Sequence, residues 1–240
     1  MWLRRIIHCL AIKYLMFTKL LSFGDSWSYG SELPENSKTY NQLIADKFNI
    51  SHACYAVPST SIEHLLIQLK KAINNDLELK NALAIFILTS PTRSIYFDNG
   101  IPKEIHIRNE DLISKNYFKY HWSNDLDHLK LNTVILALQK ICKEYNINDY
   151  YVCGFNRIDI NYPGIDITKI YDQGKNHLAG LLNCQQPVNI IDNMDFSIDK
   201  TNPFIFPNIC HPNQLGHIKI AETLHSWITD AHTKIQLYSH

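Results

Sequence analysis

The sequence predicts a three-layer α/β/α sandwich built on a mostly parallel β-sheet. The first observation is a β-α-β-α-β order of apolar segments over residues 19–88. The second is the run of six apolar residues at 83–88, which is typical of a central strand covered by helices on both faces. The third is composition: 240 residues, of which 45% are hydrophobic and 19% charged, suffice for one substantial core without disulfides.

The first half of the chain alternates strands and helices. Apolar residues recur at helical spacing in the two predicted helices, and the second helix opens with Thr60-Ser61-Ile62-Glu63, which has the form of a capping box. The first strand ends at Gly24, before a polar turn. The predicted elements are strands at 19–23, 51–57 and 83–88, and helices at 38–48 and 60–73.

The second half departs from this alternation. Its predicted elements are a hairpin of 94–97 and 101–107 around Asp98-Asn99-Gly100, a helix at 125–145, a strand at 150–155 and a helix from about 214 to 235. The inward face of the last helix is predicted to consist of Ile218, Ala221, Leu224 and Ile228.

The chain is predicted to form one domain over residues 19–240, preceded by an N-terminal extension at 1–18. Two insertions are expected in this domain, near 94–123 and 156–207. The second is rich in Asn, Asp, Pro and Gly and lacks long periodicity, so we expect a loop region along the rim of a cleft.

Charge and cysteine content argue against several classes of protein. The chain has 23 Lys plus Arg and 23 Asp plus Glu, so its formal net charge is zero. Without an excess of positive charge, nucleic acid is not expected as a partner. The six cysteines form no C-x-x-C pair, which argues against a zinc knuckle or a redox dithiol. No metal and no cofactor is expected. His217 and His225, on or near one helix, are expected to be exposed or packed.

The N-terminal segment contains Arg4-Arg5 and an apolar stretch that faintly resembles a signal peptide. Lys13 interrupts this stretch, no small-residue cleavage site follows, and the run is too short to span a bilayer. We expect a short leading helix or a translation start at Met16. The expected protein is cytoplasmic and has no membrane span, with export as the lesser alternative. The oligomeric state is not indicated.

Two blocks carry candidate chemistry. Gly24-Asp25-Ser26-Trp27 follows the first strand, where open α/β sheets place their ligand crevice. By itself this block is more often a surface turn, and Asp25 is expected to cap a turn or helix. His211-Pro212-Asn213 precedes the last helix, and a histidine in such a loop can reach a neighbouring strand end. A neutral imidazole there could accept the proton of Ser26.

Together these blocks resemble the SGNH or GDSL-type hydrolase family of esterases, lipases and carbohydrate deacetylases. Gly216, near the start of the last helix, also matches, and so does the order of the blocks. Two further blocks are similar to a subgroup of this family, namely residues 56–61 (Ala-Val-Pro-Ser-Thr-Ser) and 89–93 (Thr-Ser-Pro-Thr-Arg). About thirty residues carry the resemblance, spread over most of the chain.

The resemblance implies a role for each matching residue. Ser26 would attack an acyl carbon, and His211 would accept and then return its proton. The backbone N–H groups of Ser26 and Ser59 and the hydroxyl of Thr89 would hold the oxyanion. Apart from the resemblance, Arg93 follows a strand end, where it would bind a substrate carboxylate or phosphate or form a structural salt bridge.

Three positions depart from the family pattern. Typical members have Gly in place of Ser59 and an Asn, within Gly-x-Asn-Asp, in place of Thr89. The acid usually found three residues before the histidine is here Asn208. Asparagine can orient an imidazole but cannot balance the charge of an imidazolium ion. The role of orienting His211 falls to Asn208 or to a carboxylate elsewhere, such as Asp192 or Asp195.

The sequence thus predicts a serine hydrolase of the esterase or deacetylase type, acting on a small-molecule or carbohydrate ester. Two alternatives remain. One is a catalytically impaired scaffold that only binds a ligand, and the other is an acyltransferase that uses the same Ser26 and His211.

Overall fold

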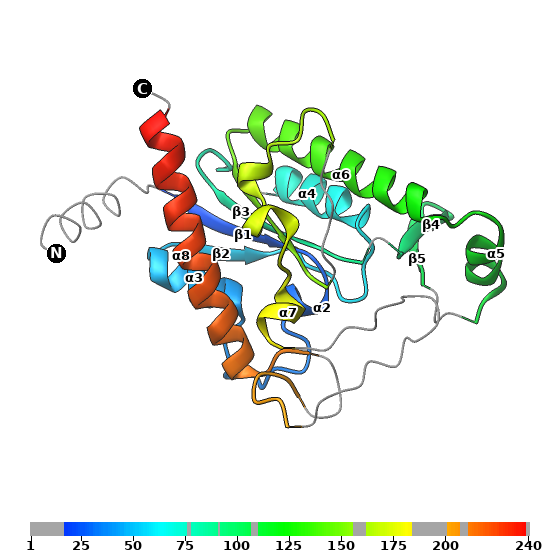
Figure 1. Ribbon diagram of the computed structural model, residues 1–240, viewed down its shortest axis with the longest axis horizontal. Coiled ribbons are helices and arrows are strands. Elements are labelled where there is room, and N and C mark those ends of the chain that lie inside the picture. Colours follow the sequence, from blue (N-terminus) through cyan, green and yellow to red (C-terminus); the bar gives the residue numbers. More distant parts are fainter. Residues whose placement is uncertain are drawn as a thin grey trace, which may run out of the picture.

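The computed structural model describes residues 17–75, 78–90, 92–106, 110–155, 162–183, 201–206 and 211–238. Its main sheet has four strands in the order β2-β1-β3-β6, and every neighbouring pair is parallel. The predicted mostly parallel sheet is therefore confirmed (Figure 1). The strands are β1 (Lys19–Phe23), β2 (Ser51–Cys54), β3 (Leu83–Leu88) and β6 (Asn148–Cys153).

Helices cover both faces of this sheet, which completes the predicted three layers (Figure 1). Successive residues of a strand point to opposite faces, so Leu21 packs in the cluster under one pair of helices and Leu20 in the cluster under the other. One layer contains α4 (His64–Asn75) and α6 (Asn124–Glu144), and the other contains α3 (Tyr40–Phe48) and α8 (Gln214–Tyr238).

Three aromatic rings on neighbouring strands stack across the face that α4 and α6 cover. The centroids of Phe23 and Phe86 lie 4.5 Å apart, and those of Phe86 and Tyr151 lie 5.2 Å apart. All six residues of β3 are buried, as the run of apolar residues predicts. Cross-strand aromatic pairs of this kind stabilise the centre of the sheet and fix its register.

Several boundaries differ from the sequence prediction. β2 ends at Cys54, although the two next backbone hydrogen bonds still go to the β1 side: Tyr55 donates to the Ser22 carbonyl and Val57 to the Gly24 carbonyl. β6 spans 148–153 and not 150–155. The capping box predicted at 60–63 is wrong, because α4 begins at His64 and the Thr60 hydroxyl donates to the Gly24 carbonyl.

The inward face of α8 also needs one correction. Ile218 is 37% exposed, whereas Ala221, Leu224 and Ile228 are buried as predicted. Ile220 and His217 are buried in its place. The prediction placed Ile218 inward because it counted only apolar residues, whereas the buried position next to it is occupied by the polar residue His217.

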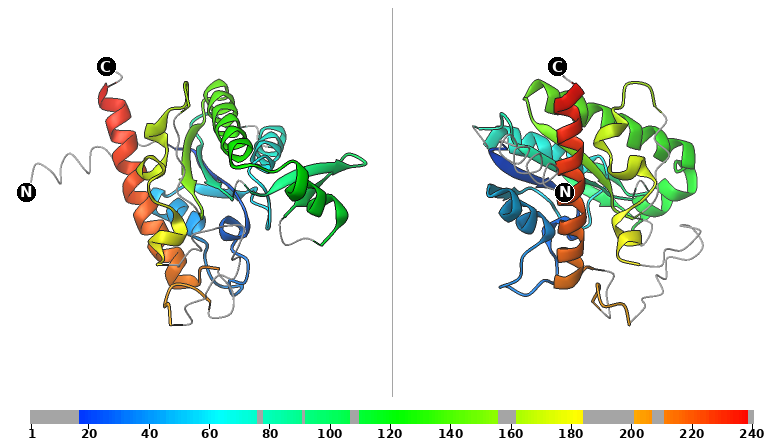
Figure 2. Two further views of the ribbon diagram at one scale, coloured as in Figure 1. Left: turned by 45° about the vertical axis from the view of Figure 1, so that its right-hand side comes forward. Right: turned by 60° about the vertical axis from the view of Figure 1, so that its left-hand side comes forward.

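The predicted hairpin is present as β4 (Ser94–Asp98) and β5 (Ile101–Ile105). Asn99 and Gly100 both have positive φ, 50° and 79°, as a tight two-residue hairpin turn requires. The hairpin and the following helix α5 (Leu112–Tyr120), which was not predicted, project from the end of the molecule away from α8 (Figure 2).

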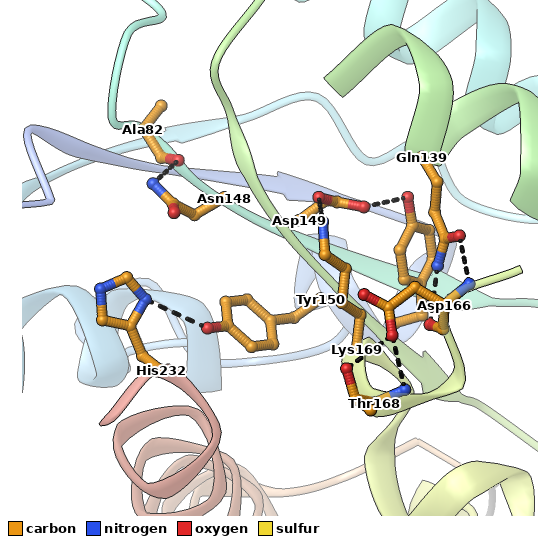
Figure 3. A network of polar contacts seen from close by, with 10 residues as sticks. Ala82, Gln139, Asn148, Asp149, Tyr150, Asp166, Thr168, Lys169 and His232 are labelled. Atoms are coloured by element: carbon orange, nitrogen blue, oxygen red, sulfur yellow. Dashed lines mark hydrogen bonds and ion pairs between the residues drawn. The ribbon is translucent and has the colours of Figure 1, made fainter. Parts of the chain in front are cut away.

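Residues 162–183 form the short elements η1 (Ile167–Lys169), η2 (Tyr171–Gly174) and α7 (Leu178–Leu181). A polar network attaches this segment to β6 near the amino end of the strand (Figure 3). The buried carboxylate of Asp149 lies 2.5 Å from Lys169 Nζ and accepts a hydrogen bond from the Tyr151 hydroxyl at 2.8 Å. Burial raises the pKa of the Asp149 carboxyl, and Lys169 opposes that rise. Gln139 of α6 adds two hydrogen bonds to the backbone of Asp166.

Cys54, Cys142 and Cys153 are free thiols, while Cys9, Cys184 and Cys210 lie outside the described residues. Within the described part of the chain, no helix combines the length and apolar character needed to cross a bilayer.

Candidate active site

The candidate residues gather at one edge of the sheet. Because the four strands are parallel, the segments that follow their carboxyl ends meet at the same edge. Ser26 follows β1, Ser59 follows β2, Thr89 follows β3 and Phe155 follows β6. This edge is opposite to the one where Asp149 and Lys169 pair.

The turn that presents Ser26 requires a glycine. Gly24 has φ +144°, and a Cβ there would lie 2.4 Å from the Ser28 hydroxyl and 2.9 Å from Ile87 Cβ. The one-turn helix α2 (Ser26–Tyr29) begins directly afterwards. The Oδ1 atom of Asp25 accepts the Trp27 N–H at 3.1 Å, so the predicted capping role of Asp25 is confirmed.

An amide from α4 holds this turn in place. Gln68 accepts the Gly24 N–H and donates to the Gly24 carbonyl, both at 2.9 Å. The Thr60 hydroxyl donates to the same carbonyl at 3.3 Å. Sequence analysis missed Gln68. The signal that could have found it is an amide at a position that helical spacing assigns to the buried face of α4, beside Leu65 and Leu69.

The structure brings the two main candidates together. His211 Nε2 lies 3.0 Å from Ser26 Oγ, although the two residues are 185 positions apart in the chain. The His211 side chain is 25% exposed, so a molecule arriving from solvent can reach the pair. A hydroxyl within hydrogen-bond range of an imidazole nitrogen is the geometry that proton transfer requires.

Hydrogen bonds between the histidine block and the segment at 203–206 hold His211 in place. Phe206 donates its N–H to the His211 carbonyl at 3.0 Å, and Asn213 Nδ2 donates to the Pro203 carbonyl at 2.8 Å. Asn213 Oδ1 also accepts the Gly216 N–H at 3.1 Å, which caps α8. A Cβ on Gly216 would lie 2.2 Å from the Phe204 carbonyl oxygen, so this contact between segments needs a glycine.

The other ring nitrogen of His211 faces a carboxylate that the sequence analysis did not single out. Glu32, in the loop after α2, forms an ion pair with His211 Nδ1. Asn208, Asp192 and Asp195 lie outside the described residues, so their predicted roles stay predictions. No local pattern in the sequence marks Glu32, because its contact with His211 joins segments that are far apart in the chain.

Ser59 and Thr89, the residues of the other two predicted oxyanion donors, lie at the same edge as Ser26. Ser59 is exposed and has φ +62°, a left-handed conformation that glycine adopts more readily. This agrees with the glycine that the resembled family has at the position. Thr89 is 1% exposed, and its hydroxyl has no hydrogen-bond partner among the described residues.

Arg93 lies beside the Ser26 turn. Its Nη1 atom is 3.7 Å from Asp25 Oδ2 and donates to the Thr60 carbonyl at 3.4 Å, and its guanidinium lies 5.9 Å from the centroid of the Phe155 ring. Burial raises the pKa of the Asp25 carboxyl, and the charge of Arg93 opposes that rise. These contacts support the structural alternative for Arg93. Its role toward a substrate stays a prediction.

Two aromatic residues of the first block differ in placement. Trp27 is 2% exposed and packs edge-on against Phe155 at 5.1 Å, whereas Tyr29 is 56% exposed. His217 and His225 are packed against Tyr40 and Phe48, respectively. In the part of the chain that the structure describes, no group of three or more His, Cys, Asp or Glu side chains could hold a metal ion.

Comparisons with known proteins gave solved structures but no sequence match. No family model and no curated protein matches the chain. A lipolytic protein of the G-D-S-L family from Veillonella parvula is 12% identical, with a TM-score of 0.44, and the match covers 85% of this chain and 94% of that one. A putative lipolytic protein of the same family from Desulfitobacterium hafniense is 11% identical, with a TM-score of 0.45 and coverages of 88% and 99%.

A third structure is a carbohydrate esterase whose active site is described as having divergent catalytic and non-catalytic binding functions. It is 13% identical, with a TM-score of 0.46, and the match covers 89% of this chain and 65% of that one.

Proposed function

We propose that this protein is a serine hydrolase that cleaves small-molecule or carbohydrate esters. The observation that carries the proposal is the 3.0 Å distance between His211 Nε2 and Ser26 Oγ at the carboxyl edge of a parallel sheet. Both residues are only partly buried, so solvent and a substrate can reach them.

The reaction would proceed in two halves. In the first, Ser26 Oγ forms a bond to the acyl carbon while its proton passes to His211 Nε2. The tetrahedral intermediate then expels the alcohol, which takes that proton, and leaves an ester on Ser26. In the second, His211 accepts a proton from water, the resulting hydroxide attacks the acyl carbon, and Ser26 leaves with the proton from His211.

The oxyanion formed in each half needs hydrogen-bond donors. We assign this role to the backbone N–H groups of Ser26 and Ser59 and to the Thr89 hydroxyl. The placement of these residues after β1, β2 and β3 supports the assignment, as does the unpartnered Thr89 hydroxyl. One such donor typically lowers the barrier by about 3 kcal/mol.

The test is turnover of a short-chain aryl ester, combined with labelling by a fluorophosphonate. The wild type should hydrolyse the ester and react covalently, and Ser26→Ala should lose both properties while keeping its circular dichroism spectrum. Ser31→Ala, at a serine in the loop directly after α2, is the matched control and should behave like the wild type. Undiminished turnover by Ser26→Ala would reject the assignment. A wild type that binds ester but is neither active nor labelled would indicate the binding scaffold.

A further inference from the structure

We propose that Glu32 is the positioning residue that orients His211 and balances its charge during the reaction. This inference rests on the proposed function, and it places the acid of the site in the loop after α2. The usual position of the acid, three residues before the histidine, is here occupied by Asn208, which carries no charge.

The contacts place the His211 ring between two oxygen groups. Nε2 lies 3.0 Å from Ser26 Oγ, and Nδ1 faces the Glu32 carboxylate at contact distance. A carboxylate beside Nδ1 favours the tautomer that has its proton on that atom, which leaves the lone pair of Nε2 free to face Ser26. Once the Ser26 proton has moved, the same carboxylate stabilises the positive ring.

The backbone of the loop is shaped to present Glu32. Glu32 has φ +66°, a left-handed conformation that costs a residue with a side chain roughly 1–2 kcal/mol. Gly30 has φ +83°, and a Cβ there would lie 2.5 Å from Thr39 Cγ2. Ser31 donates its N–H to the Ser26 carbonyl at 3.1 Å, so the loop turns back toward α2. Strained residues of this kind persist where the surrounding structure holds them, and they cluster at functional sites.

Separate contacts fix this loop against α8, the helix that follows His211. Gln214, in the first turn of α8, accepts the Lys38 N–H at 3.1 Å and donates to the Lys38 carbonyl at 3.2 Å. His217 Nδ1 accepts the Tyr40 N–H at 3.0 Å, one helical turn further along. The relative placement of Glu32 and His211 therefore does not depend on their ion pair alone.

The other carboxylates described near the Ser26 turn are already committed or lie at the surface. Asp25 is fully buried, with one oxygen capping α2 and the other facing Arg93. Glu35 is exposed on the same loop as Glu32. This makes Glu35 a matched control, since it offers the same side chain three residues away.

Glu32→Gln tests the proposal with little change in size or backbone preference. An amide cannot balance an imidazolium charge, and its NH₂ can donate to Nδ1, which would put the ring proton on Nε2 and block acceptance from Ser26. We expect kcat to fall by about 10²–10⁴-fold with KM nearly unchanged. Glu35→Gln should stay within about threefold of the wild type. Glu32→Asp, which keeps the charge, should retain more activity than Glu32→Gln.

A second measurement applies even where turnover is weak. In Ser26→Ala protein, the Nδ1 proton of His211 should give a strongly downfield resonance, and that resonance should disappear when Glu32→Gln is added. A fully active Glu32→Gln variant, or loss of activity in Asn208→Ala but not in Glu32→Gln, would overturn the inference. Failure of the proposed function is a distinct result, because the wild type itself would then neither turn over ester nor react with fluorophosphonate.

Discussion

The imidazole of His217 lies nearly parallel to the ring of Tyr40, at 13° and 5.6 Å between centroids, while its Nδ1 accepts the Tyr40 N–H. Accepting that hydrogen bond requires a lone pair on Nδ1, so the ring is neutral with its proton on Nε2. His217 is fully buried. Burial, with a smaller effect from His211, lowers its pKa from 6.5 to about 4.

This histidine should make the fold sensitive to acid. Between pH 6.5 and 4 the unfolded chain binds a proton at His217 that the folded chain does not, so stability falls as pH decreases through that window. We expect the loss to reach roughly 2–3 kcal/mol near pH 4. The measurement is the free energy of unfolding by urea at a series of pH values.

A variant isolates the contribution of His217. His217→Asn is expected to be less stable at pH 7 but to show a smaller loss of stability between pH 6.5 and 4. His121→Asn, which changes an exposed histidine, should keep the wild-type pH dependence. Equal pH dependence in all three proteins would show that His217 is not the source.

Gln68→Leu should weaken both the fold and the reaction. It removes two hydrogen bonds to Gly24 and leaves the buried Gly24 N–H without its partner, which costs about 2–3 kcal/mol of unfolding free energy. Because the Gly24 turn presents Ser26, kcat should fall at least tenfold. The measurements are urea unfolding and ester turnover.

The chain offers a close control for this substitution. Gln139 also makes two hydrogen bonds to the backbone of a single residue, Asp166, near the opposite edge of the sheet. Gln139→Leu should therefore lose comparable stability while kcat stays within about twofold of the wild type. A fall in kcat of the same size in both variants would mean that the effect reflects general destabilisation and not the position of Ser26.

Ser59→Gly should stabilise the protein. The left-handed conformation at φ +62° costs serine more than glycine, and part of this gain is offset by the greater freedom of glycine in the unfolded chain. We expect a net gain of about 0.5–1 kcal/mol with ester turnover retained, since the backbone N–H is unchanged. Ser37→Gly, at a loop residue with ordinary negative φ, should instead lower the unfolding free energy. Destabilisation by Ser59→Gly would contradict this account.

Much of the fold follows from local patterns in the sequence. The strand at 83–88 is a continuous apolar run, and the hairpin turn at Asn99-Gly100 needs positive φ at both residues, so each was predicted within a residue or two. Ser26 and His211 could be found because short blocks in a fixed order mark them, and the structure brings them together.

Other features depend on contacts between distant segments and leave little local trace. The Thr60 hydroxyl donates a hydrogen bond to the Gly24 carbonyl and does not cap α4. No local pattern in the sequence reveals this partner. Helix α5 was missed because Leu112 and Tyr120 are exposed, so its apolar residues do not form a buried stripe. Glu32 was missed because its partner is set by the docking of a loop on α8, far from it in sequence.

The two hydrogen bonds between Gln214 and Lys38 have a consequence for the order in which the active site is assembled during synthesis. Both oxygen partners of the imidazole come from within seven residues of each other, whereas the ring itself comes from a segment synthesised 185 residues after the serine. During synthesis, Ser26 is therefore present long before His211 is available to accept its proton. The site would therefore become active in a single step, when the first turn of α8 docks on the loop through Gln214 and Lys38.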